Sequence, residues 1–363
     1  MGFDVSGFLR KNGAWIGFGL LALVLTIATD GGFLSARNLT NLIRQASING
    51  ILASGMTVII ITGGIDLSIG SIAALAGVTA GITQVFWGWA GLGAMGALGT
   101  LLMGCGVGLL SGILTGGLVA WLGIAPFVIT LGLMVVARGL ALIFSEGASI
   151  SPMGDALGEI SSGYLPQTFS VVLTLLVLAG LAFHYRRRIS EGVFPLLTFM
   201  FLAWAFLSYR GFPTLAIFLL VTTCLVSFLL NHTVFGRSVY AIGSNERAAF
   251  WAGVPIRKVK WLVYSLMGLL AGLTGVLLTA RLNGADPNSG QLFELDAIAA
   301  AVIGGTRLQG GVGTVMGAFI GALTIATLNN GMDLLGVTSF YQMCCKGAVI
   351  VIAVSLDKSQ KDR

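Results

Sequence analysis

Residues 67–137 read LSIGSIAALAGVTAGITQVFWGWAGLGAMGALGTLLMGCGVGLLSGILTGGLVAWLGIAPFVITLGLMVVA and contain no Asp, Glu, Lys or Arg. As a single helix this stretch would be about 107 Å long, more than three times the roughly 30 Å hydrocarbon core of a membrane. It must therefore fold back on itself. We predict turns at Trp87-Gly-Trp89, where the aromatic rings suit a membrane interface, and at Gly123–Pro126.

Composition extends this conclusion to the whole chain. Of 363 residues, 56% are hydrophobic and 9% are charged, and the mean hydropathy is +0.95, whereas about 25% of residues are charged in a soluble domain. The 53 glycines suit the close packing of transmembrane helices. We therefore predict an all-α, polytopic inner-membrane helical bundle, with residues 1–363 as one transmembrane domain.

Polar interruptions divide the chain into about twelve crossings, which we interpret as ten core helices plus an inserted pair at 168–209. Cytoplasmic loops of membrane proteins are rich in Lys and Arg. By this rule the triple arginine 186–188, the loop 237–260 and the tail 358–363 are cytoplasmic, as are both termini. Arg37 and Arg44 disagree, because this topology places them outside. The net charge of +6 is read as a topology signal and not as a nucleic-acid-binding surface.

The loop between two of the predicted spans contains a short helix signal. Residues 235–260 read FGRSVYAIGSNERAAFWAGVPIRKVK. Asn245 suits the N-cap, Glu246 the first turn and Gly253 the end of a helix with alanines on its surface. Such a helix lets another protein approach the backbone closely, but a connector helix that contacts nothing fits the pattern equally well.

Two similar segments recur far apart in the chain. TGGIDLSIGS at 62–71 and IGGTRLQGGV at 303–312 share Gly-Gly-x-(charge)-Leu-x-x-Gly, each at the junction of two apolar runs. They are either broken helices that line a transport path or ordinary turns at the cytoplasmic surface. The residues that we single out as candidates for the path are Gly63, Gly64, Asp66, Ser68, Arg138, Gly304, Gly305 and Arg307.

Three of these candidates carry a charge within apolar sequence. A charge that faces lipid at the centre of a span costs about 2.5–3.5 kcal/mol, so each should face protein, water or the interface. Asp66 fits either the path or the cap of the following helix. Arg138 could instead extend its charged group to the interface. Arg307 matches Asp66 in position and opposes it in sign, and we hypothesise that the two form an ion pair.

Motifs for enzymatic chemistry are missing from the sequence. It contains no Gly-x-x-x-x-Gly-Lys-[Ser/Thr] phosphate loop, no nucleophile elbow and no metalloprotease motif. The four cysteines lie in or beside apolar runs without zinc-like spacing. We therefore expect a transport subunit that is not an enzyme and has no catalytic residues, no metal and no cofactor of its own.

Several long motifs, in order along essentially the whole chain, resemble the ribose/xylose-type permeases of bacterial ABC sugar importers. The segments that carry this resemblance are 35–44, 64–70, 126–132 with Arg138-Gly139, 236–246 and 294–305. The inserted pair, and the loops at 149–152, 163–166 and 209–213, are most similar to the members that carry D-xylose. Arg307 and Gly64 depart from the pattern of these relatives, which leaves the chemistry of the path and the sugar open.

The resemblance implies partners and roles for particular residues. Glu246-x-Ala248-Ala249-x-x-x-Gly253 is similar to the motif that couples such permeases to their ATPase. The residues expected to couple are Gly243, Asn245, Glu246, Ala248, Ala249 and Gly253. The family implies a homodimer, a cytoplasmic ABC ATPase subunit that binds the ATP, and a periplasmic sugar-binding protein. The alternatives are a permease for ribose or a hexose, an ion-coupled secondary sugar transporter that uses Asp66, and a scaffold subunit without a pathway.

Overall fold

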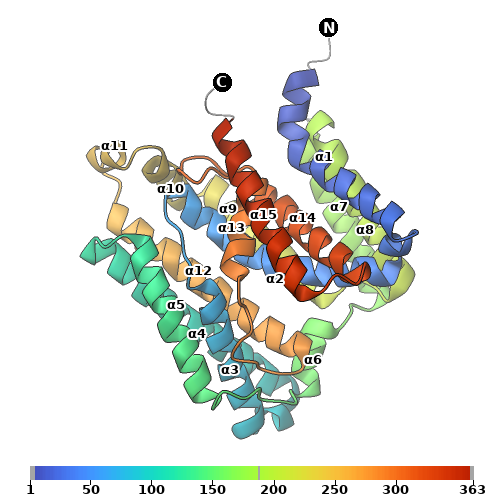
Figure 1. Cartoon of the computed structure of the whole chain (residues 1–363), viewed down its shortest axis with the longest axis horizontal. Coiled ribbons are helices and arrows are strands. Elements are labelled where there is room, and N and C mark those ends of the chain that lie inside the picture. Colours follow the sequence, from blue (N-terminus) through green and yellow to red (C-terminus); the bar gives the residue numbers. More distant parts are fainter. Residues whose placement is uncertain (1–4, 187–188, 360–363) are drawn as a thin grey trace.

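The structure, a computed structural model, describes residues 5–186 and 189–359 (Figure 1). Within these ranges every long element is a helix, and the β-structure is limited to two isolated bridges, Ile150 with Ala285 and Tyr164 with Pro213. The predicted all-α class is confirmed. In chain order the helices are α1 (Val5–Ala28), α2 (Ala36–Ile61), α3 (Ile69–Gly81), α4 (Gly93–Leu122), α5 (Pro126–Phe144), α6 (Asp155–Ser162), α7 (Gln167–Tyr185), α8 (Ile189–Tyr209), α9 (Thr214–His232), α10 (Val234–Ser244), α11 (Glu246–Trp251), α12 (Ile256–Leu282), α13 (Phe293–Ile303), α14 (Val315–Leu334) and α15 (Ser339–Ser359).

The described residues include seven helices that are long and apolar enough to cross a membrane. Two shorter apolar helices, Gly13–Ala28 and Gln167–Phe183, accompany them. The polytopic architecture is confirmed, while the number of about twelve crossings stays a prediction. Both turns predicted in the charge-free stretch are present. The first follows a π-helical turn at Ile82–Phe86, and the second has Gly123 at φ +67° with Pro126 as the first residue of α5.

A seam of glycines joins α4 to α12. Gly104, Gly108 and Gly112 lie four residues apart on one face of α4, and they meet Gly268 and Gly272 of α12. A Cβ atom added at Gly108 would lie 2.3 Å from the carbonyl oxygen of Gly268, and one added at Gly272 would lie 2.4 Å from that of Gly104. The two backbones are therefore in direct contact, as small residues allow in membrane helix pairs.

A second tightly packed group holds α2 to α13 and α14. Asn38 Nδ2 donates to Asn330 Oδ1 at 2.8 Å, and Asn330 Nδ2 donates back to Asn38 Oδ1 at 2.9 Å. Further along these helices, four fully buried alanines pack together: Ala53, Ala300, Ala318 and Ala322. Side-chain amides that bond across helices stabilise membrane bundles by about 0.6–2 kcal/mol.

Of the two arginines that disagree with the predicted topology, Arg44 has a local explanation. Arg44 Nη2 donates to the carbonyl oxygens of Ser162 and Gly163, and its guanidinium lies 4.5 Å from the centre of the Tyr164 ring. Its charge is therefore held by the end of α6 and the segment after it. A residue with such partners is a weak topology signal.

The segments that the sequence predicts to be cytoplasmic lie towards one end of the molecule. Figure 1 shows the first turns of α1, the last turns of α15 and α11 at the same upper edge. Arg186 follows α7, and its side chain is exposed over the ring of Phe183. Residues 187 and 188 of the triple arginine, and residues 360–363 of the basic tail, lie outside the described residues.

Candidate coupling and translocation site

Two short helices, α10 and α11, form the loop that the sequence singled out. Thr233 caps α10 by accepting from the Gly236 amide at 3.3 Å, and Asn245 Oδ1 caps α11 by accepting from the Ala248 amide at 3.0 Å. Gly253, at φ +80°, ends the second helix. Because the Asn245 cap and the Gly253 terminator are those read from the sequence, the predicted short helix α11 is confirmed.

The exposed surface of α11 differs from the prediction. Ala249 is buried in the core, so the expectation of an alanine surface is wrong for this residue, although Ala248 is exposed. The most prominent side chains are Phe250 and Trp251, which are 62% and 85% exposed with ring centroids 5.8 Å apart. Two adjacent aromatic residues in a polar loop were the sequence signal for this surface.

A groove of about 1080 Å³ separates α11 and the start of α12 from the end of α4 and the start of α5. Its lining combines Trp121 and Phe250 with the charged residues Glu246, Arg257 and Lys260. Lys260 Nζ lies 2.8 Å from Glu246 Oε1 at the surface. Such an exposed pair contributes at most about 1 kcal/mol, so it orients Glu246 more than it stabilises the fold.

Gly243, near the end of α10, lies directly against the break that follows α2. A Cβ atom there would be 1.7 Å from the carbonyl oxygen of Ile61, the last residue of α2. The same oxygen accepts from the Gly311 amide at 2.9 Å. The loop helices and both Gly-Gly segments therefore meet at one carbonyl group.

Tyr240 strengthens this junction, and the sequence analysis did not single it out. Its hydroxyl donates to the carbonyl oxygen of Gly313 at 2.8 Å, which ties α10 to the loop before α14. Burial raises the pKa of Tyr240, so the hydroxyl keeps its proton at physiological pH and stays a donor.

The first Gly-Gly segment leads from this junction into the bundle. Gly63 turns the chain at φ +79°, and Figure 1 shows the connection from α2 descending from the α10 side to α3. Asp66 is 1% exposed, and its Oδ1 accepts from both the amide and the hydroxyl of Ser68. The carboxylate thereby fixes Ser68, the residue that precedes α3, near a helix start where the dipole favours a negative charge.

The start of α3 meets the segment that leads into α13. A Cβ atom at Gly70 would lie 2.1 Å from the Gly290 carbonyl oxygen and 2.9 Å from Glu294 Oε2. Helix α13 has 11 residues, about 16 Å, and therefore spans only half of the hydrocarbon core. Arg138 of α5 binds the segment before it by donating to the carbonyl oxygens of Pro287 and Ser289. The guanidinium thus binds protein carbonyl groups, while its position relative to the interface stays a prediction.

The second Gly-Gly segment ends α13. Gly304 packs against the backbone of Gly317 in α14, and Gly305 turns the chain at φ +88°. Arg307 follows in an exposed turn that its amide closes by donating to the Val312 carbonyl. Because Asp66 is buried and bonded to Ser68, the two charges form no ion pair, and the hypothesised pairing is wrong. Local sequence did not indicate that one segment turns inward while the other stays at the surface.

Tyr264 of α12 explains why residue 64 is small. A Cβ atom at Gly64 would lie 2.6 Å from the Tyr264 hydroxyl, which is buried and has no hydrogen-bond partner among the described residues.

Among the described residues, no group of three or more His, Cys, Asp or Glu side chains could hold a metal ion. The site offers close backbone contacts and single buried polar groups.

Residues 38–354 match the protein family described as the permease component of the branched-chain amino acid transport system. The chain belongs to this family. The permease is 38% identical to the xylose transport system permease protein XylH of Haemophilus influenzae, over 96% of each chain. It is 39% identical to the ribose import permease protein RbsC of Bacillus subtilis, over 98% of this chain and 94% of that one. No solved structure matches it.

These matches confirm the resemblance to ribose/xylose-type permeases that the motifs indicated. Because the family and these relatives are transport components, the permease is a transport subunit and not an enzyme. Its apolar helices make it a multi-pass membrane protein.

Proposed function

We propose that the permease forms the membrane pathway of an ATP-driven importer for a monosaccharide, with D-xylose as the first candidate. A separate ATPase subunit drives it through α10 and α11. The observation that carries this proposal is the contact of Gly243 with the Ile61 carbonyl, because it joins the exposed loop helices to both helix breaks.

The coupling step follows from this contact. An ATPase that moves α11 moves α10 with it, and the backbone of Gly243 leaves no space for α10 to slide past the end of α2. The displacement reaches the irregular segments 62–68 and 304–314. The first segment holds Asp66 and leads into α3, and the second follows the half-length helix α13, whose first turn holds Glu294. Broken helices of this kind line the substrate path in many carriers.

The assembly that we propose has two copies of the permease, two ATPase subunits and a periplasmic binding protein, in a bacterial inner membrane. The acidic segment 145–167 receives the binding protein, and both termini are cytoplasmic. Helix α5 supports a role for a second copy, because only 22% of its most apolar window is buried within one chain.

The sugar is proposed from the relatives and from the inserted pair α7–α8, whose sequence is similar to that of xylose-carrying members. The similar identity to a xylose permease and a ribose permease makes both pentoses candidates. The test is to co-purify the permease with its binding protein and to identify the pentose that this protein retains. Retention of ribose in preference to xylose would replace the sugar and leave the ATP-driven mechanism in place.

The energy source separates an ABC importer from an ion-coupled carrier. Vesicles that contain the permease with its co-purified partners should take up pentose when ATP is supplied inside, with an uncoupler present. Uptake that requires an ion gradient and ignores ATP would overturn the proposed function.

The exposed aromatic pair of α11 should anchor the ATPase. Replacing Phe250 and Trp251 by alanine should weaken ATPase binding by about 2 kcal/mol, about thirtyfold in Kd, because buried aromatic anchors dominate protein interfaces. Binding of the purified ATPase to the permease in nanodiscs measures this. Phe340, 80% exposed on α15, provides the control in Phe340→Ala. Equal losses in both variants would assign the effect to surface apolarity in general.

A further inference from the structure

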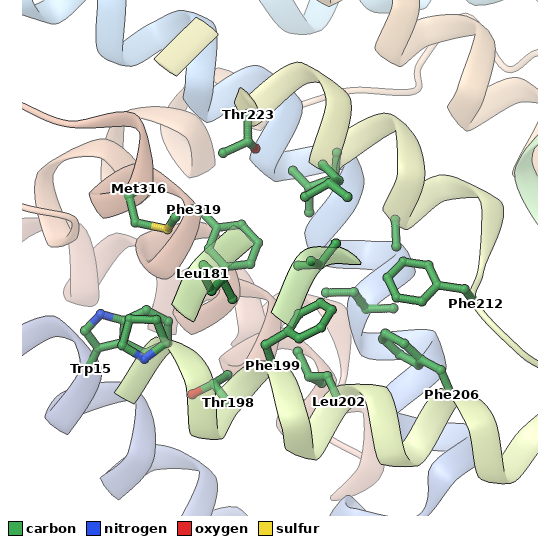
Figure 2. Close-up of a pocket in the computed structure, with 16 residues that line it drawn as sticks. Trp15, Leu181, Thr198, Phe199, Leu202, Phe206, Phe212, Thr223, Met316 and Phe319 are labelled. Atoms are coloured by element: carbon green, nitrogen blue, oxygen red, sulfur yellow. The ribbon is translucent and has the colours of Figure 1, made fainter. Parts of the chain in front are cut away.

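An apolar cavity of about 120 Å³ lies between the helix pair α7–α8 and the helices of the core (Figure 2). Helix α8 packs on α7, α1 and α2, and the cavity is the space that this packing leaves open. Figure 2 shows Trp15 at one end and Phe206 with Phe212 at the other, with Phe199 and Leu202 between them. A second apolar cavity, of about 240 Å³, shares Ile43, Thr198 and Leu202 with the first.

The lining of the first cavity excludes both water and sugar as the natural occupant. It contains no charged residue, and the side-chain hydroxyls are those of Thr198 and Thr223. Thr223 Oγ1 is buried without a hydrogen-bond partner in the part of the chain that the structure describes. A buried water needs two to four polar partners, and an apolar cavity of about 150 Å³ stays dry and takes up apolar molecules. The occupant should therefore be a hydrocarbon.

A described cation lies beyond one end of the cavity. Leu181 lines the cavity wall, and Arg186 follows it by five residues, about 7.5 Å along the chain. Beyond the Phe206 end stands Arg210, which lies over the rings of Tyr164 and Tyr209. The end of α7 that precedes Arg186 lies on the side of the molecule that carries α11 in Figure 1.

We propose that this cavity is a lipid site, in which one acyl chain of an anionic phospholipid enters between α8 and the core. Its phosphate lies near Arg186, in the leaflet on the α11 side. The cavity volume admits a segment of one acyl chain, and the remainder of the lipid stays in the bilayer. Basic residues at the cytoplasmic ends of transmembrane helices bind anionic headgroups, which attracts such a lipid in preference to a zwitterionic one. The lipid fills the space between the helix pair and the core.

Trp15 provides the probe for this site. The permease is reconstituted in nanodiscs that contain phosphatidylglycerol or phosphatidylcholine with brominated acyl chains, and quenching of Trp15 is obtained as the difference between the native chain and Trp15→Phe. We expect apparent binding about fivefold tighter for brominated phosphatidylglycerol, as about 1 kcal/mol for one nearby arginine implies. Equal quenching by both lipids would overturn the headgroup assignment.

Two substitutions separate the cavity from the general lipid environment. Ala216→Met places a longer side chain in the cavity and should abolish the preferential quenching, whereas Ala182→Met, on the exposed face of α7, should leave it unchanged. Arg186→Gln should remove the preference for phosphatidylglycerol and keep the permease folded. Quenching that survives Ala216→Met would overturn the cavity as the site. Native mass spectrometry of the native chain should find a retained phospholipid, and a free fatty acid or detergent in its place would overturn the assignment to a phospholipid.

Discussion

The Gly243→Ala variant should insert in the membrane normally and lose most ATP-driven uptake. The added methyl group would lie 1.7 Å from the Ile61 carbonyl oxygen, so α10 and the end of α2 must separate in the conformation described here. Overpacking of this kind costs about 1–3 kcal/mol. When this cost falls on only one of the two conformations that alternate during transport, it changes the equilibrium constant between them by about 5–150-fold. Uptake by vesicles, normalised to the amount of inserted permease, measures the loss.

Gly117→Ala is the matched control for this prediction. It makes the same substitution near the groove beside α11, but the nearest atoms to its added methyl group belong to Trp121, at 3.9 Å. This variant should transport like the native permease. Binding of the ATPase should be unchanged in Gly243→Ala, because the substituted position faces α2 and not the surface of α11. Loss of ATPase binding in Gly243→Ala would show that the residue shapes the docking surface and does not transmit its movement.

The second large effect concerns stability. Gly108→Ala should destabilise the permease by about 1–3 kcal/mol or more, because its added methyl group would lie 2.3 Å from the Gly268 carbonyl oxygen and 2.6 Å from the Cα atom of Gly272. Rigid backbone cannot move away as a flexible side chain can, so α4 and α12 must separate. Thermal unfolding in detergent, followed by fluorescence and size-exclusion chromatography, provides the measurement.

Gly106 tests whether the seam itself is responsible. It lies on the same helix, two residues away, and no atom lies within 4 Å of its added methyl group. Gly106→Ala should therefore unfold at or slightly above the native temperature, because alanine is the better helix former. Similar destabilisation in both variants would contradict direct backbone contact between α4 and α12.

Local patterns predicted the elements of this fold well. The absence of charge over residues 67–137 predicted the membrane-spanning class, the aromatic and Gly–Pro positions predicted the turns, and Asn245 with Gly253 predicted the bounds of α11. Each of these features depends on residues close together in sequence. Hydrophobicity, turn chemistry and helix caps act at that range.

The arrangement of the site depends on contacts that no local pattern contains. Asp66 and Arg307 occupy matching positions in two similar segments, yet Asp66 is buried and bonded to Ser68 whereas Arg307 is exposed. The meeting of Gly243, Ile61 and Gly311 joins three segments that are far apart in the chain. The alanine that faces inward on α11, and the aromatic pair that faces outward, follow from the packing of α10 and α12 around them.

The paired amides of Asn38 and Asn330 have a consequence for how this molecule changes shape. Together with the alanine contacts they fix α2 to α14, while the glycines fix α4 to α12. Each helix pair can then rotate only as a rigid body. Bending is left to the irregular stretches 62–68 and 304–314, so we expect hydrogen exchange to be fast there and slow within both pairs throughout the transport cycle.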